Sequence, residues 1–137
     1  MKVSSRLLLL TVSCLLMAVV SSCRSLSVKK DYRTLAGSWK EEWGAEDVKY
    51  NDIYQIAHLG GNKLAITCKG KANYIISGVS YDKKILRLQL EIRDNKYKTG
   101  SATVQYELKL SQSPSVLVGT AVNHENKTIP VRWLKQE

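Results

Sequence analysis

The chain has 137 residues, 44% of them hydrophobic, and its 21 Lys and Arg against 12 Asp and Glu give a net charge of +9. This length suits one domain and argues against a second independent core. The excess of basic residues favours acidic partners. However, no basic cluster is interleaved with stacking aromatic residues, so we expect no nucleic-acid partner. We expect instead a soluble surface beside a negatively charged membrane or cell wall.

The first segment, residues 1–22, has the pattern of a secretory signal peptide. Lys2 and Arg6 precede an apolar run from Leu7 to Val20 that contains no charge. The run is shorter than the roughly 20 apolar residues that a membrane-spanning helix requires. We therefore predict that residues 1–22 are removed and take no part in the fold.

The apolar run ends in Val20-Ser21-Ser22-Cys23, which resembles the lipobox of bacterial lipoproteins. The resemblance implies that Cys23 receives diacylglycerol, becomes the first mature residue and carries acyl chains such as palmitate as a permanent membrane anchor. The alternative is ordinary secretory cleavage beside a chance cysteine. Because Arg24 follows in place of an aspartate, we expect the protein at the outer membrane, facing the periplasm.

The mature chain divides into a short polar, basic tether over residues 23–34 and one domain over residues 35–137. Cys68 is the one remaining cysteine, so no intramolecular disulfide is expected. It alternates with Leu64 and Ile66, which predicts a small buried residue and not a nucleophile.

From Leu35 onward, apolar and polar residues alternate with a period of two, which is typical of strands with one buried and one wet face. The clearest strands cover residues 86–93 and 102–110. Six more are expected at 38–43, 52–58, 63–69, 73–81, 115–123 and 128–135, with turn-forming residues between them. No amphipathic helix is expected. Eight sequential strands predict an all-β fold, a small antiparallel up-and-down β-barrel, because closure removes the edges of the sheet.

The two ends of this region resemble lipocalins and related calycin barrels. Gly37-Ser38-Trp39 opens the first strand as the Gly-x-Trp signature does in that family. The resemblance implies that Trp39 packs across the closed end of the barrel and contacts a basic residue near the C-terminus, either Arg132 or Lys135. The region is shorter than typical lipocalins and lacks their helix before the last strand, which argues against a large cavity.

A hollow barrel of this size would hold one small ligand. The inward positions expected to line it are Trp43, Leu88, Leu90, Val104, Tyr106 and Leu108. Such a lining suits an apolar or amphipathic molecule, such as a lipid or an envelope metabolite. The same residues could fill a solid barrel. That barrel would bind a protein or a cell-wall polymer with its outer surface, as an inhibitor, an immunity factor or an envelope-assembly factor.

Candidate catalytic and metal-binding residues are few. His58 and His124 match no zinc-binding spacing, and we expect both at strand ends or turns. The acidic residues near the first strand are expected to be solvated: Glu41, Glu42, Glu46 and Asp47. No nucleophile elbow, phosphate-binding loop or dinucleotide motif is present. We therefore expect neither an enzyme nor a cofactor or metal site.

Overall fold

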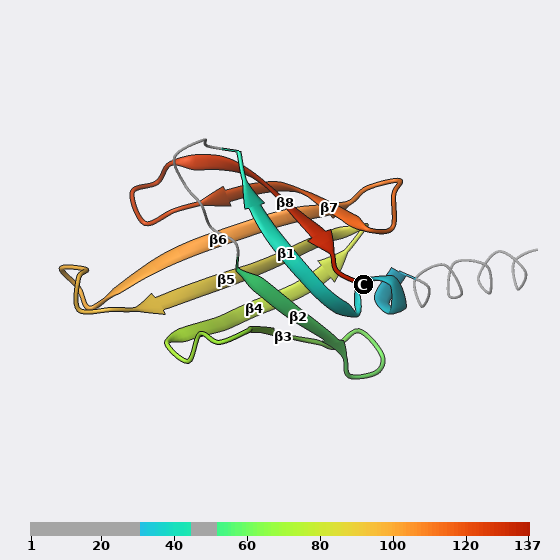
Figure 1. Cartoon of the computed structure of the whole chain (residues 1–137), viewed down its shortest axis with the longest axis horizontal. Helices are drawn as coiled ribbons and strands as arrows, with labels where there is room; N and C mark the ends of the chain where they lie inside the picture. Colours follow the sequence, from blue (N-terminus) through green and yellow to red (C-terminus); the bar gives the residue numbers. More distant parts are fainter. Residues whose placement is uncertain (1–30, 45–51) are drawn as a thin grey trace, which may run out of the picture. The chain divides into compact units, whose positions relative to one another are not determined.

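A computed structural model describes residues 31–44 and 52–137, and these include one antiparallel β-sheet of eight strands (Figure 1). The strands are β1 (Gly37–Trp43), β2 (Ile53–His58), β3 (Leu64–Cys68), β4 (Tyr74–Asp82), β5 (Ile85–Arg93), β6 (Ser101–Leu110), β7 (Val116–Val122) and β8 (Thr128–Lys135). Each lies within one residue of its predicted bounds. The all-β antiparallel fold is therefore confirmed.

The strands form a nearly closed barrel. Their order is β3-β2-β1-β8-β7-β6-β5-β4, so the first strand pairs with the last and the others pair as hairpins. Among the described residues, no hydrogen-bonded ladder joins the two edge strands, β3 and β4, although they approach each other. In Figure 1, β1 passes in front of β5 and β6, and β2 passes in front of β4.

A short helix over residues 31–35 precedes β1 in the chain, where no helix was expected. Its last residue, Leu35, is fully buried and belongs to the core of the barrel unit, which covers residues 34–137. The predicted signal peptide and Cys23 lie outside the described residues. Within the described residues, no helix has the length and apolar character needed to cross a membrane.

Alternate residues of the strands fill the barrel. In β6, for example, Ala102, Val104, Tyr106, Leu108 and Leu110 are buried, and the residues between them are not. Fully burying a large apolar side chain contributes about 1.5–3 kcal/mol, so this repeated burial supplies much of the stability. The alternation that predicted the strands thus has its cause in the one-sided burial of the sheet.

Strands β6 and β7 come unusually close at Gly119. Gly119 lies opposite Leu108 in the ladder. A Cβ atom at this position would lie 1.8 Å from the carbonyl oxygen of Glu107. Any other residue would therefore force the two strands apart.

Trp39 anchors the start of β1. It is fully buried, and its Nε1 donates a 2.7 Å hydrogen bond to the carbonyl oxygen of Leu35. The Lys135 ammonium lies 5.4 Å from the centre of a Trp39 ring and donates to the carbonyl oxygen of Thr34. Gly37 makes room for this lysine, because its φ is 131° and a Cβ there would lie 3.0 Å from Lys135 Cε.

Arg132, the other basic residue proposed to contact Trp39, lies elsewhere. Its side chain is 60% exposed, and its Nε donates to Glu42 Oε2 at 2.7 Å. Because successive side chains of a strand point to opposite faces, the inward position of Trp133 places Arg132 outside and Lys135 inside. The basic partner of Trp39 is therefore Lys135 and not Arg132.

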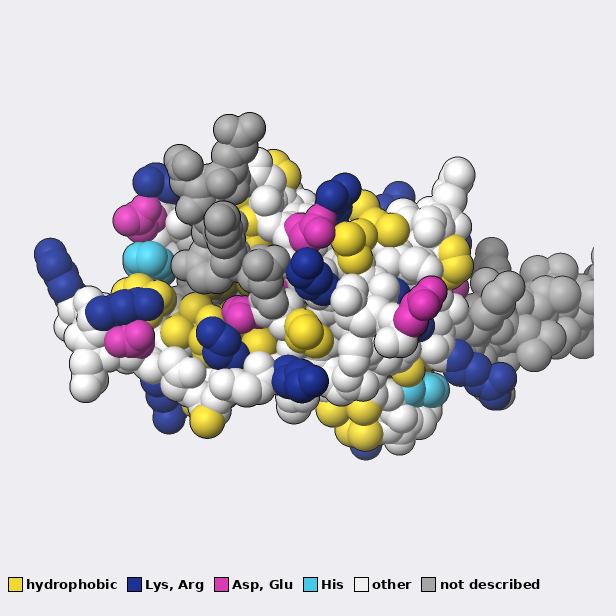
Figure 2. Space-filling model, viewed as in Figure 1, with side chains coloured by type: hydrophobic (Ala, Val, Ile, Leu, Met, Phe, Trp, Pro, Cys, Tyr) yellow, Lys and Arg dark blue, Asp and Glu magenta, His cyan; other side chains and the backbone are white. Residues whose placement is uncertain are grey.

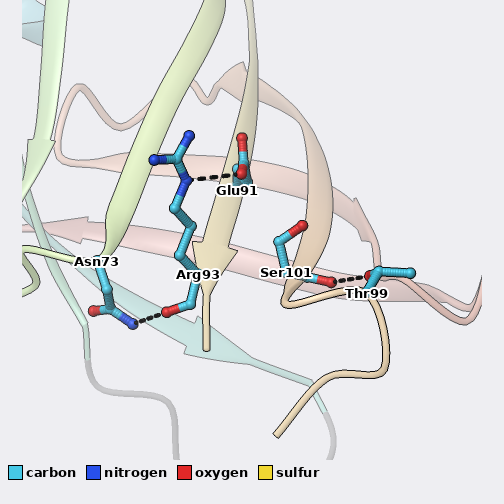
Figure 3. Close-up of polar contacts among 5 residues, drawn as sticks. All are labelled: Asn73, Glu91, Arg93, Thr99 and Ser101. Atoms are coloured by element: carbon cyan, nitrogen blue, oxygen red, sulfur yellow. Dashed lines mark hydrogen bonds and ion pairs between the residues drawn. The ribbon is translucent and has the colours of Figure 1, made fainter. Parts of the chain in front are cut away.

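Polar contacts shape the connection between β5 and β6, which carries Tyr97. Figure 3 shows three contacts around it: Asn73 Nδ2 donates to the Arg93 carbonyl (3.0 Å), Arg93 Nε to Glu91 Oε1 (3.0 Å), and Thr99 Oγ1 to the Ser101 carbonyl (2.9 Å). The Tyr97 amide also donates to the carbonyl oxygen of Asp94 at 3.1 Å. These bonds hold the backbone from which the Tyr97 side chain projects.

Candidate functional site

A cavity of about 160 Å³ lies inside the barrel, at the end that carries the β5–β6 and β7–β8 turns. Five aromatic residues contribute to its wall: Trp43, Tyr54, Tyr74, Tyr97 and Tyr106. Four aliphatic residues complete the apolar part: Leu90, Ile92, Val104 and Ile129. The inner wall, with Tyr54 and Tyr106, is buried, whereas His124 in the lining is exposed. The cavity therefore opens to solvent beside His124.

The structure divides the six residues that were expected to line a cavity. Four of them, Trp43, Leu90, Val104 and Tyr106, line this one. Leu88 and Leu108 also point inward and are buried, but they do not line it. Inward residues at successive positions of a strand lie at different depths of the barrel, and only those near one end reach the cavity.

Several lining residues were not predicted from the sequence, and Glu41 is the buried carboxyl group among them. It was expected to be solvated, but it is only 1% exposed and points into the barrel. The available sign was its position between Trp39 and Trp43, since residues two apart share one face of a strand. Its neighbour Glu42 faces outward to Arg132. Glu46 and Asp47 lie outside the described residues.

Hydrogen-bond donors surround the Glu41 carboxyl group. Tyr106 Oη donates to Glu41 Oε1 at 2.7 Å, and Tyr54 Oη lies 3.5 Å from Tyr106 Oη. Burial raises the pKa of Glu41 to about 7; Tyr106 and the indoles of Trp43 and Trp133 lower it, while Asp52 raises it. The effect of burial on the pKa of Glu41 is therefore larger than that of the donors, and Glu41 exchanges a proton near neutral pH.

The second carboxylate of the lining, Asp52, has a cation beside it. Lys71 Nζ lies 3.5 Å from Asp52 Oδ1, and Tyr74 Oη donates to Asp52 Oδ2 at 3.1 Å. The same ammonium lies 5.4 Å from the Tyr74 ring centre. By contrast, none of the ion pairs within residues 31–44 and 52–137 includes Glu41.

Two further ionisable groups near Glu41, the Tyr106 hydroxyl and the Cys68 thiol, keep their protons at neutral pH. Burial raises the pKa of the Tyr106 hydroxyl well above its ordinary value, so it stays a donor. Burial, with the nearby Asp52 and Glu41, raises the pKa of the Cys68 thiol to about 12, so this free cysteine is not a thiolate at neutral pH.

Both histidines lie at turns or strand ends. His58 ends β2, and its Nε2 lies 2.9 Å from the carbonyl oxygen of Gly61. The His124 ring packs edge-on against Tyr97, with the ring centres 5.2 Å apart. Across the described residues, no group of three His, Cys, Asp or Glu side chains could hold a metal ion.

The site thus combines aromatic walls with one buried acceptor group at its inner end, and it opens beside an aromatic–histidine pair. This arrangement suits a small molecule with an apolar body and one polar end. No family model matches the chain, and no curated protein or solved structure matches it.

Proposed function

We propose that this protein is a membrane-anchored lipoprotein whose lipocalin-like barrel binds a small apolar or amphipathic ligand. The observation that carries the proposal is the cavity of about 160 Å³ with its largely apolar wall. A buried apolar cavity of about 150 Å³ is large enough for benzene. A ligand whose apolar body has this size therefore fits, and a long acyl chain does not.

Filling the cavity tests this function. Val104→Phe adds a ring to the cavity wall and should weaken the binding of toluene to the full chain by at least about tenfold, because the space is already taken. Trp43 lines the cavity, so its fluorescence reports the binding. The matched control is Leu108→Phe, at a buried position outside the lining, which should keep its affinity. Equal toluene binding by wild type and Val104→Phe would contradict the proposal.

The anchor is a separate part of the proposal and is supported by residues 1–23 of the sequence. Cells that express the wild type should incorporate labelled palmitate into the protein, which should sediment with outer membranes. Cys23→Ser removes the thiol that accepts the lipid and should lose both properties. Cys68→Ser, at the other mature cysteine, should retain both. Palmitate in the Cys23→Ser variant would disprove anchoring at this residue.

The alternative function, in which the outer surface of a solid barrel binds a protein or cell-wall partner, has less support. The exposed large apolar residues of the described chain are Leu59, Ile75 and Val118. They belong to three different parts of the fold, the β2–β3 turn, β4 and β7. A protein-binding surface typically presents a contiguous apolar patch.

A further inference from the structure

We propose that the cavity selects a small organic cation: an amine with an apolar body about the size of a benzene ring, whose ammonium group pairs with Glu41. This inference rests on the proposed function and narrows its ligand class. Three properties of the cavity carry it: a buried carboxyl group that forms no ion pair among the described residues, aromatic walls, and the distribution of charge around the opening.

The first property is that Glu41 forms no ion pair with any Lys, Arg or His within residues 31–44 and 52–137. A buried carboxylate is costly unless a positive charge and hydrogen bonds compensate for it. Tyr106 supplies a hydrogen bond at 2.7 Å, but the ion pairs of the described residues leave Glu41 without a cation. The cavity lies directly beside this carboxyl group. An ammonium group bound there would supply the positive charge.

The second property is the aromatic wall. Trp43, Tyr54, Tyr74 and Tyr97 line the same cavity as Glu41. The faces of aromatic rings attract cations, most strongly where water is excluded. The same rings offer apolar contact to the rest of the ligand. A carboxylate at the inner end of such walls matches an ammonium group on an apolar body.

The third property is the charge distribution. The chain has an excess of Lys and Arg, and Figure 2 shows them spread over the outer surface of the face in view. The cavity lining nevertheless contains two carboxylates and, among the described residues, no Lys or Arg. Two lysines lie over tyrosine rings of the lining, Lys71 over Tyr74 and Lys96 over Tyr97. Both form ion pairs with aspartates, Lys71 with Asp52 and Lys96 with Asp94. The negative charge of an anionic ligand would therefore lie beside the Glu41 carboxylate, with no positive charge of the lining to offset the repulsion.

Cation binding must also depend on pH. The ionisable groups that act on Glu41 or line the cavity with it are Asp52, Tyr54, Tyr74, Tyr97, Tyr106 and His124, and Cys68 lies nearby in β3. With a pKa of about 7, Glu41 is largely protonated at pH 5 and ionised at pH 8. Binding of an ammonium below pH 7 therefore releases a proton. The affinity should rise by up to about tenfold per pH unit below pH 7 and level off above it.

The test compares three probes of one size, benzylamine, benzyl alcohol and benzoate, by calorimetric titration of the full chain in detergent at pH 8. We expect benzylamine to bind at least about tenfold more tightly than benzyl alcohol, and benzoate most weakly. Glu41→Gln should abolish the preference for the amine and leave the binding of benzyl alcohol. Glu42→Gln, the adjacent carboxyl on the outer face, is the matched control and should keep the preference.

The outcomes separate the two proposals. Equal binding of benzylamine and benzyl alcohol, or tighter binding of benzoate, overturns the amine inference and leaves the small-molecule function intact. Binding of none of the probes, with toluene included, overturns the function itself. If Glu41→Gln does not fold, the benzylamine affinity of the wild type is measured as a function of pH. An affinity that does not change between pH 5 and 8 overturns the inference.

Discussion

Replacing Trp39 with alanine should lower the free energy of unfolding by about 3–5 kcal/mol, the usual cost of truncating a large buried aromatic side chain. Trp39 is fully buried, donates a hydrogen bond to Leu35 and lies under the Lys135 ammonium. The change would leave a cavity and would remove the donor to the Leu35 carbonyl. Urea unfolding of the full chain, followed by far-ultraviolet circular dichroism, measures the loss.

An exposed apolar residue provides the control for this experiment. Leu59, in the β2–β3 turn, is 63% exposed, and Leu59→Ala should change the stability by no more than about 0.5 kcal/mol. A Trp39→Ala variant as stable as the wild type would mean that Trp39 does not hold the start of β1 in the way the contacts indicate.

Stability should also fall by about 3 kcal/mol as the pH rises from 4.5 to 7, through the titration of Glu41. Burial raises the pKa of this group from 4.5 to about 7 in the folded chain. Between these values the folded chain keeps the proton and the unfolded chain loses it, so folding takes up a proton and a higher pH favours unfolding. Above pH 7 both states are ionised, and the contribution of Glu41 becomes constant.

The comparison with Glu41→Gln isolates this effect from all other titrating groups. Urea unfolding at a series of pH values should show the variant gaining stability relative to the wild type as the pH rises from 4.5 to 7. Glu42→Gln should follow the wild type, because Glu42 lies on the outer face beside Arg132. A constant difference between wild type and Glu41→Gln would show that Glu41 keeps an ordinary pKa.

The two predictions concern Trp39 and Glu41, which lie in the same strand. The sequence predicted the burial of Trp39 but not that of Glu41. Trp39 was expected in the interior because Gly37-Ser38-Trp39 resembles the lipocalin signature, whose tryptophan packs across the closed end of the barrel. Glu41 has the same place in the alternation, which predicts an inward side chain. A carboxylate is rarely buried, however, so Glu41 was interpreted as solvated. The conflict between pattern and residue type at Glu41 marks the candidate site.

The partner of Trp39 shows a similar limit. Arg132 and Lys135 are both basic residues at the end of the chain, and the sequence offered both. The register of β8 against β1 decides between them, because Trp39 lies opposite Lys135 and Glu42 opposite Arg132. Register depends on pairing across the whole sheet. Arg132 and Lys135, three residues apart in β8, therefore point to opposite faces and have different partners.

By itself, the sequence determined the eight strands, their bounds and the antiparallel barrel, because alternation and turn residues act locally and one-sided burial imposes a period of two. Only the tertiary structure decided which inward residues line a cavity and which merely fill the barrel. It also placed Glu41 beside Tyr106, 65 residues away along the chain, with Tyr54 next to both. Closure of the barrel brings β1, β2 and β6 together across its interior, and no local pattern encodes the depth at which their side chains meet.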